Sequence, residues 1–160
     1  MMEGKPMIKD MALHKDQTTK IHVMKLSDGT VQTFDTEEWI LVLHTANAYQ
    51  EDGTLVLEAQ TFENKDNNPF DSISFDKINN ANKFLEHDFS SKFKKMSFNL
   101  IDGTFKLKNY MGVDNGIIDL PMFNPKYSGI KNCFTYLIHE WGATTIDENY
   151  SFPIHKYDSC

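Results

Sequence analysis

Short apolar or alternating runs, separated by polar turns, recur along the whole chain and constrain its fold more than any other feature. Alternation of apolar and polar residues is typical of half-buried β-strands. We therefore predict an all-β protein whose connections between neighbouring strands favour a propeller or a barrel. The expected strands are KIHVMKL (20–26), TVQTFD (30–35), WILVLHTANAY (39–49), TLVLEAQTF (54–62), KKMSFNLI (94–101), TFKLKNYM (104–111), GIIDLPMF (116–123), NCFTYLIHEWG (132–142) and FPIHKYD (152–158).

Three of the turns contain an Asp-Gly pair, at 28–29, 52–53 and 102–103. This pair is typical of tight hairpin turns, which need positive φ angles. The segment 68–93 lacks alternation, and we expect a long connection there with a helical turn or two. No Gly-Ser or Pro-rich linker divides the chain, so we expect residues 1–160 to form a single domain.

The net charge of -7 and the absence of arginine disfavour a nucleic-acid partner, which would require clustered cations. The densest basic cluster, Lys92, Lys94 and Lys95, is flanked by acidic segments, and we interpret it as a solvated strand edge. Cys133 and Cys160 are far apart and predict neither a disulfide scaffold nor a metal knuckle. A reducing, cytoplasmic location fits best, because no signal-like or membrane-spanning stretch is present.

His44 stands in the run WILVLHTANAY, whose two faces are both largely apolar, which predicts a strand buried on both sides. With a two-residue turn at 52–53, His44 would pair with Thr61 and Asn47 with Glu58. A buried imidazole needs partners for both ring nitrogens. From spacing alone, His44 is either a hydrogen-bonded core residue or a metal ligand.

The stretch LHTANAYQEDGTLVLEAQTF resembles the Phe-His-His-Ile-Asn-Ala-Tyr-Glu segment of the carotenoid cleavage oxygenases, the family of the carotene oxygenases and the retinoid isomerohydrolase. The resemblance continues upstream through KIHVMKLSDGTVQTF. Downstream, GIIDLPMFNPKYSGIKNCFTYLIHEWG is similar to the Glu-Phe-Pro segment of the family, and FPIHKYD is similar to the strand that follows. The order and the gaps agree across residues 20–158.

This resemblance implies a seven-bladed β-propeller that holds a non-haem Fe(II) ion on four histidines. His44 corresponds to the third ligand in chain order. The first two ligands would precede residue 1, and the fourth would follow Cys160. We therefore expect a middle-to-late fragment of about three incomplete blades, at roughly 40 to 45 residues each.

Asp119 stands where the family has the Glu before Phe-Pro, and the resemblance implies that it orients the His44 ring. Ligating histidines usually donate their second N–H to such a carboxylate. Because aspartate is one methylene shorter, the strand must come closer or a water must bridge. The alternative is an ordinary strand-end Asp before a proline turn.

The remaining histidines do not supply the missing ligands. His22 and His155 fall on positions that are not ligands in the family, and His87 comes after His44, in the wrong order. We expect His139 to cap a strand end. His14-Lys15-Asp16 lies in a polar N-terminal segment and is a poor candidate for a two-histidine, one-carboxylate iron site.

Several positions depart from the family pattern: Thr45, Gln50 and Asn124-Pro125 replace its second His, its Glu and its Asn-Tyr. These differences put close catalytic competence in doubt without disturbing the fold. Aromatic residues downstream could contribute to a polyene tunnel, although such a stripe is more often core. They are Phe123, Tyr127, Phe134 and Tyr136.

The function implied by the resemblance is Fe(II)- and O₂-dependent cleavage of a carotenoid or apocarotenoid double bond to aldehyde or ketone products, in carotenoid or retinoid metabolism. The isolated chain is expected to be inactive, because it supplies only one of the four imidazoles that the resemblance implies for iron binding. The sequence does not decide whether the full-length protein contacts a membrane surface. Two alternatives remain: a noncatalytic β-rich protein that binds an apolar ligand or a partner, and a degenerate full-length relative without the other histidines.

Overall fold

The computed structural model describes residues 14, 16–63, 90–112, 116–141 and 153–160, which form nine strands and one short 3-10 turn. All nine predicted strands are confirmed, and each predicted end lies within two residues of the observed one. His87 lies outside the described residues. The same is true of the expected connection at 68–93, except for its last residues, 90–93. The elements are β1 (Lys20–Met24), β2 (Val31–Asp35), β3 (Leu41–Glu51), β4 (Thr54–Phe62), β5 (Lys92–Asn99), β6 (Phe105–Gly112), β7 (Gly116–Met122), η3 (Pro125–Tyr127), β8 (Phe134–Trp141) and β9 (Ile154–Asp158).

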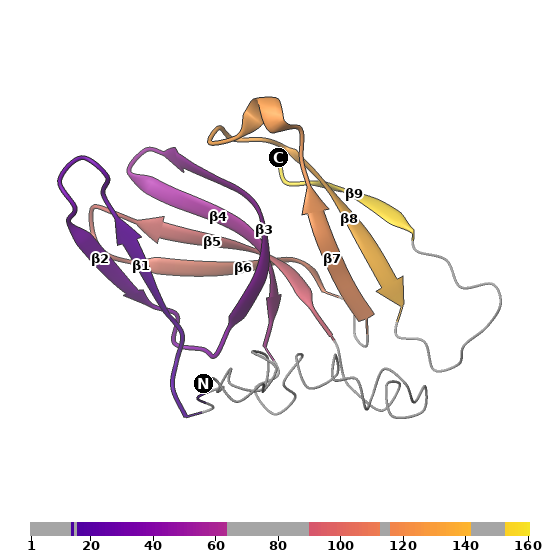
Figure 1. The fold of residues 1–160 in the computed structure, drawn as a ribbon, viewed down its shortest axis with the longest axis horizontal. Coiled ribbons are helices and arrows are strands. Elements are labelled where there is room, and N and C mark those ends of the chain that lie inside the picture. The colour runs from indigo at the N-terminus through magenta and orange to yellow at the C-terminus, as the bar shows by residue number, and fades with distance from the viewer. Residues whose placement is uncertain (1–13, 15, 64–89, 113–115, 142–152) are drawn as a thin grey trace, which may run out of the picture.

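The strands form three antiparallel sheets in which every paired strand is a neighbour in the chain order (Figure 1). We call them the first sheet (β1-β2), the central sheet (β3-β4-β5-β6) and the third sheet (β7-β8-β9). The described residues include no helix long and apolar enough to cross a membrane. The prediction of an all-β class is confirmed.

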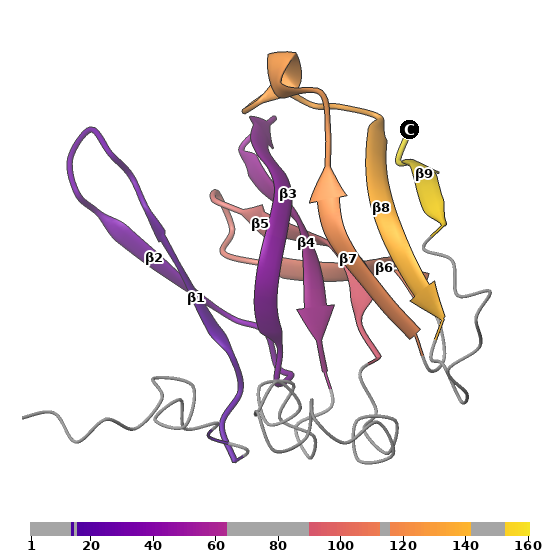
Figure 2. The same cartoon turned by 45° about the vertical axis from the view of Figure 1, so that its right-hand side comes forward.

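The central sheet lies between the other two, and each of its faces has its own apolar core (Figure 2). On the side of the first sheet, Phe34 of β2 packs edge-on against Phe98 of β5, with ring centroids 5.1 Å apart. On the side of the third sheet, Ile118 and Leu137 cluster with Phe93. Sheets stacked in chain order over separate cores are the arrangement of successive propeller blades.

The β3-β4 hairpin closes through Asp52 and Gly53, whose φ angles are 47° and 73°. Positive φ at both central residues is the conformation that matches the twist of paired strands. The hairpins at Gly29 and Gly103 also use glycines with positive φ. All three predicted hairpins are confirmed.

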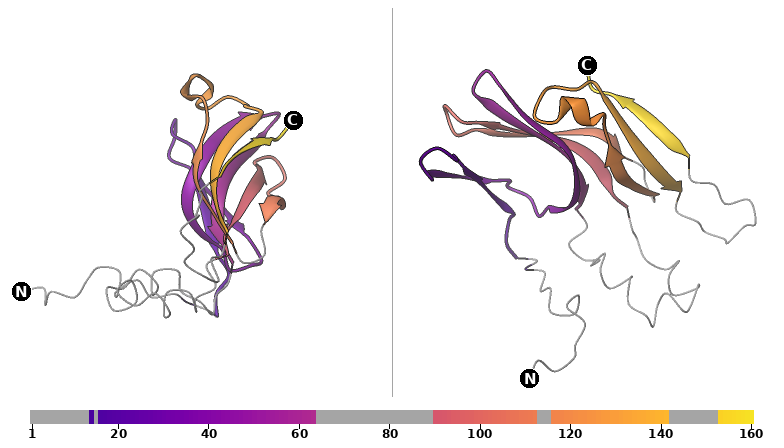
Figure 3. Two further views of the ribbon diagram at one scale, coloured as in Figure 1. Left: turned by 90° about the vertical axis from the view of Figure 1, so that its right-hand side faces the viewer. Right: turned by 45° about the horizontal axis from the view of Figure 1, so that its top comes forward.

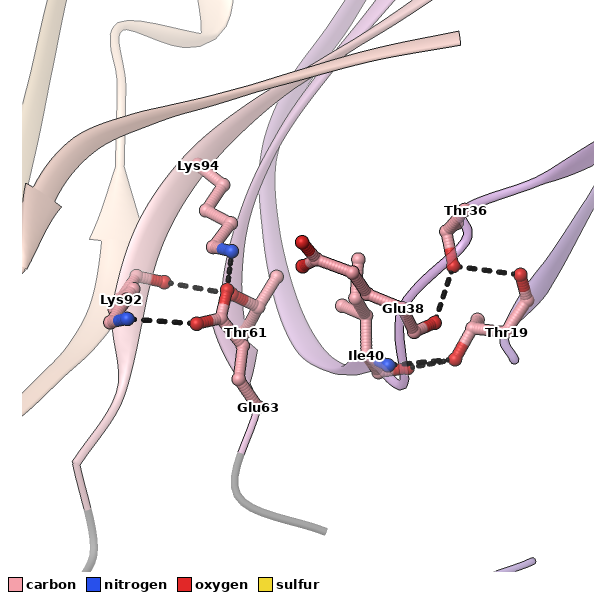
Figure 4. A network of polar contacts seen from close by, with 8 residues as sticks. All are labelled: Thr19, Thr36, Glu38, Ile40, Thr61, Glu63, Lys92 and Lys94. Carbon is pink, nitrogen blue, oxygen red and sulfur yellow. Dashed lines mark hydrogen bonds and ion pairs between the residues drawn. The ribbon is translucent and has the colours of Figure 1, made fainter. Parts of the chain in front are cut away.

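The interpretation of Lys92, Lys94 and Lys95 as a solvated edge is wrong, because β5 pairs with both β4 and β6. Lys94 is 2% exposed and forms an ion pair with Glu63, which also accepts a hydrogen bond from Lys92 at 2.8 Å (Figure 4). Burial lowers the pKa of Lys94, and the charge of Glu38 acts in the opposite direction. Sequence alternation could not reveal this, because the first sheet covers the face that carries Lys94.

The connection from β2 to β3 is fixed by two threonines (Figure 4). The hydroxyl of Thr19 donates to the carbonyl of Ile40 at 2.7 Å and accepts the N–H of Ile40 at 2.8 Å. The hydroxyl of Thr36 lies 2.8 Å from the Thr19 carbonyl and 2.6 Å from that of Glu38. These contacts satisfy backbone groups at the bend and set the start of β3.

Cys133 and Cys160, which predicted neither a disulfide scaffold nor a metal knuckle, form one disulfide with Cα atoms 5.1 Å apart. The antiparallel pairing of β8 with β9 brings together residues 27 positions apart, a proximity that spacing alone did not reveal. In Figure 3 this C-terminal end lies on the same side of the molecule as the loop with η3. The cytoplasmic location stays a prediction.

Candidate metal-ligand site

Strand β3 carries the first residue of the candidate site, and its pairing with β4 contains two irregularities. Near the turn the predicted register is confirmed, with Asn47 opposite Glu58. Farther along, His44 lies opposite Gln60, so the predicted pairing with Thr61 is wrong. The register shifts fall between Val42 and His44 and between Thr45 and Asn47, as expected when one strand holds an extra residue at each point.

These bulges change which side chains face the core. Ala46 and Asn47 are consecutive and both buried, whereas Thr45 and Ala48 on either side are exposed. Leu43 is 39% exposed, so the prediction that both faces of β3 are buried is wrong. In the central sheet β3 is an edge strand, paired on one side only.

The structure brings His44 and Asp119 together from different sheets. Nε2 of His44 lies 3.6 Å from Oδ1 of Asp119, and the side chains are 43% and 34% exposed. The distance exceeds the roughly 3.2 Å limit of a normal N–H···O hydrogen bond but leaves no space for a bridging water. His44 is thus half-buried rather than buried, and the carboxylate faces one of its two ring nitrogens.

The backbone around Asp119 holds the carboxylate in a fixed direction. Oδ1 of Asp119 accepts the N–H of Leu120 at 2.6 Å, and Leu120 has a φ of 48°. A left-handed conformation at a bulky residue is strained, and such strain concentrates at functional sites. The pairing of β7 with β8 is also irregular between Asp119 and Met122.

Ser91 fixes β7 against the central sheet one residue before Asp119. Its hydroxyl donates to the carbonyl of Ile118 at 2.8 Å and accepts the N–H of Ile118 at 2.8 Å, and the side chain is fully buried. This pair of hydrogen bonds fixes the position of β7 relative to the central sheet. Sequence reasoning missed Ser91, because a serine at the start of a strand carries no signal of its partner 27 residues away.

Asn47 connects the same hairpin to the loop that follows β7. Its Nδ2 donates to the carbonyls of Ile130 at 2.8 Å and Tyr127 at 3.3 Å, and its Oδ1 accepts the N–H of Gly129 at 3.3 Å. Asn47 is 4% exposed. We had matched this asparagine to the family pattern, but its role in holding the loop was not predicted.

Two buried polar residues of β4 point to the same face as His44. Glu58 is 1% exposed, and its Oε1 accepts the hydroxyl of Tyr110 at 3.4 Å. Burial raises the pKa of Glu58, against smaller opposite effects of Lys95 and Tyr110. Burial, followed by the charge of Glu58, raises the pKa of Tyr110. Gln60 is fully buried opposite His44, and neither polar atom of its amide has a hydrogen-bond partner in the described residues.

No other described histidine lies on β3 or β7, although His139 on β8 pairs with Ile118, the residue before Asp119. His22 is on β1 and its Nδ1 lies 2.9 Å from the Thr33 hydroxyl. His139 does not cap a strand end as expected, because it lies inside β8 and is 3% exposed. His155 is its neighbour on β9, and His14 is exposed. Within the described residues, no group of three or more His, Cys, Asp or Glu side chains could hold a metal ion.

The residues present fit one ligand position of a metal site. If Nε2–H of His44 donates a hydrogen bond to the carboxylate of Asp119, the lone pair of the neutral ring lies on Nδ1, which is then the nitrogen that can bind a metal. The partial exposure of the ring leaves it accessible from the edge of the central sheet. His44 can therefore act as one metal ligand, with Asp119 as the carboxylate that supports it. Further ligands must come from elsewhere.

Three of the four aromatic residues considered for a tunnel line a surface cavity of about 300 Å³ instead of the core. Tyr127, Phe134 and Tyr136 are 44%, 39% and 40% exposed, and Asn124 and Lys131 also contribute to the walls. This cavity adjoins the disulfide residue Cys133. Phe123 does not belong to its lining and is partly buried.

Solved structures of an apocarotenoid oxygenase and of chimeras made from it have a similar fold. The cobalt-substituted apocarotenoid oxygenase (ACO) of Synechocystis superposes with a TM-score of 0.63 at 16% sequence identity. An ACO/RPE65 chimera gives 0.60 at 14%. Both comparisons cover 91% of this chain and 28% of the other, so the chain spans about a quarter of the length of these structures.

No curated protein matches the sequence. The profile of the RPE65 family, described as retinal pigment epithelial membrane protein, matches residues 1–158. The match includes both His44 and Asp119, and it agrees with the resemblance to carotenoid cleavage oxygenases that the sequence motifs carry. This chain therefore belongs to the RPE65 family.

Proposed function

We propose that this chain supplies one iron-ligating histidine, His44, and its supporting carboxylate, Asp119, to a non-haem Fe(II) enzyme that cleaves a carotenoid or apocarotenoid double bond with O₂. The observation that carries the proposal is the approach of Nε2 of His44 to Oδ1 of Asp119 at 3.6 Å, across two sheets. Family membership supports the substrate class. The cobalt-substituted relative supports a metal-dependent site.

In this proposal the residues of the chain act by position. Asp119 accepts a hydrogen bond from one ring nitrogen of His44, which orients the ring and leaves the other nitrogen for the metal. Ser91 and the strained Leu120 hold Asp119 in place. Fe(II), when bound, supplies the chemistry that activates O₂ toward a conjugated double bond, giving aldehyde or ketone products.

The whole enzyme would be a seven-bladed propeller, of which this chain forms about three incomplete blades. Three further histidines would then come from outside residues 1–160. Because a single neutral imidazole does not hold Fe(II) against water, the 160-residue chain by itself is expected neither to retain iron after desalting nor to cleave β-carotene. One iron per isolated chain together with cleavage would contradict the proposal.

The decisive experiment uses the longest reading frame that contains this chain. We expect one iron per protein by elemental analysis, and His44→Ala to remove iron and cleavage together. Asp119→Asn should weaken iron binding by about 10- to 100-fold, as for other supporting partners of metal ligands. His22→Ala, on β1, is the matched control and should change neither readout. Full iron content and activity in His44→Ala would overturn the assignment.

A second candidate function is apolar-ligand binding without a metal, favoured by the aromatic cavity around Tyr127, Phe134 and Tyr136. The two functions differ in their response to a chelator. Binding of a retinoid or an apocarotenoid to the isolated chain that survives chelation, and that weakens in Tyr136→Ser, would support this candidate.

A further inference from the structure

Gln60 is a buried polar residue of β4 to which the His44–Asp119 pair assigns no role. It is fully buried, and neither its amide nitrogen nor its amide oxygen has a hydrogen-bond partner among the described residues. Buried polar side chains are normally paired, because a buried amide without a partner costs free energy. The groups that surround Gln60 therefore indicate what it acts on.

Strand pairing places Gln60 next to His44. In the central sheet β4 lies between β3 and β5, with Gln60 opposite His44 on one side and opposite Phe93 on the other. Residues directly opposite each other in antiparallel strands point to the same face, with Cβ atoms roughly 5 Å apart. This face packs on the third sheet, because Phe93 belongs to the core on that side. Gln60 and His44 are therefore side-chain neighbours beneath the third sheet.

Strand β7 crosses the central sheet close to Gln60. At Ile118 it is hydrogen-bonded to Ser91, the residue before β5, and at Asp119 its carboxylate approaches His44 on β3. Because β4 lies between β3 and β5, the step from Ile118 to Asp119 spans the part of β4 that carries Gln60. Strand β7 contacts β4 as well as its two neighbours. The buried amide therefore has His44 beside it and the Asp119 segment over it.

The carboxylate of Asp119 is the acceptor that matches this amide. Its Oδ1 accepts the N–H of Leu120 at 2.6 Å and faces Nε2 of His44 at 3.6 Å, and neither contact uses Oδ2. The amide nitrogen of Gln60 carries two N–H donors. Asp119 lies beyond direct hydrogen-bond distance of this amide. A buried water with polar partners on both sides spans such a gap.

We propose that Gln60 is a positioning residue of the His44 site, which holds Oδ2 of Asp119 through one buried water molecule. Together with the N–H of Leu120 on Oδ1, this contact fixes both oxygens of the carboxylate, so that the His44 ring keeps one orientation. The role deepens the proposed function and rests on it only where metal binding is concerned. The contact between Gln60 and Asp119 itself requires no metal.

A double-mutant cycle on the 160-residue chain tests this contact without metal. Gln60→Met replaces the amide by an unbranched apolar side chain of similar length, and urea unfolding measures stability. We expect Gln60→Met to lower the unfolding midpoint, and to lower it less when Asp119→Ala is already present, because the two residues share one contact. A higher midpoint in Gln60→Met, or additive effects of the two substitutions, would overturn the proposal.

Thr61→Val is the matched control, because it also removes a buried polar atom from β4. Thr61 is fully buried, and its hydroxyl donates to the carbonyl of Lys92 at 3.3 Å. As the next residue along the strand it points to the opposite face from Gln60. We expect Thr61→Val to lower the midpoint additively with Asp119→Ala. Coupling as strong as that of Gln60→Met would show that the effect is not local and would contradict the proposal.

Iron binding by the longest reading frame that contains this chain separates a positioning role from a purely structural one. We expect Gln60→Met to weaken Fe²⁺ binding about tenfold, the lower end of the effect for supporting partners of metal ligands. It should add nothing in Asp119→Ala, and Thr61→Val should leave the affinity unchanged. Equal affinities of Gln60→Met and the unaltered protein would overturn the positioning role. If the unaltered protein binds no iron, the proposed function fails, and the double-mutant cycle still decides whether Gln60 holds Asp119.

Discussion

The side-chain amide nitrogen of Asn47 lies 2.8 Å from the backbone carbonyl oxygen of Ile130, 83 residues later in the chain. With its contacts to Tyr127 and Gly129, this side chain satisfies three backbone groups of the loop that joins β7 to β8. The hairpin that presents His44 therefore also holds the loop after the strand that carries Asp119. The Lys131–Glu51 ion pair at 3.0 Å adds a second, exposed contact between the same two segments.

Asn47→Ala should lower the free energy of unfolding by about 1–3 kcal/mol, because it removes the hydrogen bonds that a buried side chain makes to three backbone groups of the loop. Urea denaturation followed by tryptophan fluorescence measures the change. Thr45→Ala, at an exposed position on the same strand, is the control and should change stability little. Equal effects of the two substitutions would contradict the role of Asn47.

Glu58→Gln should stabilise the protein at pH 7. The carboxylate is buried at an energetic cost, and the neutral amide keeps an oxygen for the Tyr110 hydroxyl. We expect a gain of about 1 kcal/mol or more in the free energy of unfolding. Lower stability of Glu58→Gln would mean that the carboxylate makes a favourable ion pair, with Lys95 as the nearest cation on β5.

The same residue gives the protein a pH dependence with a defined sign. Because burial raises the pKa of Glu58 above its ordinary value of 4.5, the folded state binds more protons than the unfolded state between the two pKa values. This contribution to stability is complete below pH 4.5 and is lost as pH rises through the folded-state pKa. Unfolding curves from pH 4.5 to 8 should show a fall that is smaller in Glu58→Gln.

Reduction of the Cys133–Cys160 bond should lower the free energy of unfolding by about 2–4 kcal/mol, since it releases a constraint on the unfolded chain across 27 residues. Denaturation with and without a reductant measures this difference. The double substitution Cys133→Ser, Cys160→Ser should resemble the reduced protein and should not respond to the reductant. A response of the double variant would assign the effect to another cause.

Gly53→Ala and Gly29→Ala separate backbone strain from crowding. Both glycines have a φ of 73°, so alanine at either position should cost about 1–2 kcal/mol from its left-handed conformation. A Cβ at Gly53 would meet Ile101 Cδ1 at 2.6 Å, whereas at Gly29 it meets nothing within 4 Å. Because Ile101 is 82% exposed and can turn away, we expect only a small excess for Gly53→Ala, removed by Ile101→Ala.

The sequence predicted the strands and the hairpins because both depend on local chemistry. The alternation in TVQTFD marks one buried face, and Asp52-Gly53 supplies two positive φ angles. The buried Lys94 was not predicted, because its burial depends on the sheet that covers β5. The Cys133–Cys160 bond was not predicted, because it depends on the pairing of β8 with β9. Lys94 stands between Lys92 and Lys95 in the sequence and was therefore expected to be solvated. It is buried because the first sheet covers that face of β5.

For the candidate site, the residues were named through family resemblance and their environment came from the structure. The approach of Asp119 to His44 was expected, whereas Gln60 opposite His44 was not, because the bulge between Thr45 and Asn47 shifts the register by one residue. Ser91 and the Asn47 contacts were missed for a related reason. Each acts on backbone groups of a distant segment, and no pattern in the sequence records such a partner.

In the part of the chain that the structure describes, each strand pairs only with strands next to it in chain order. A ribosome that releases residues in order therefore delivers the strands in the sequence in which they must meet, and local pairing favours fast assembly. The central sheet could be complete while the third sheet is still being synthesised. Until β7 emerges, the face of Phe93 and Glu58 would be left uncovered, which makes this interval the point at which a nascent chain is most exposed to association with others.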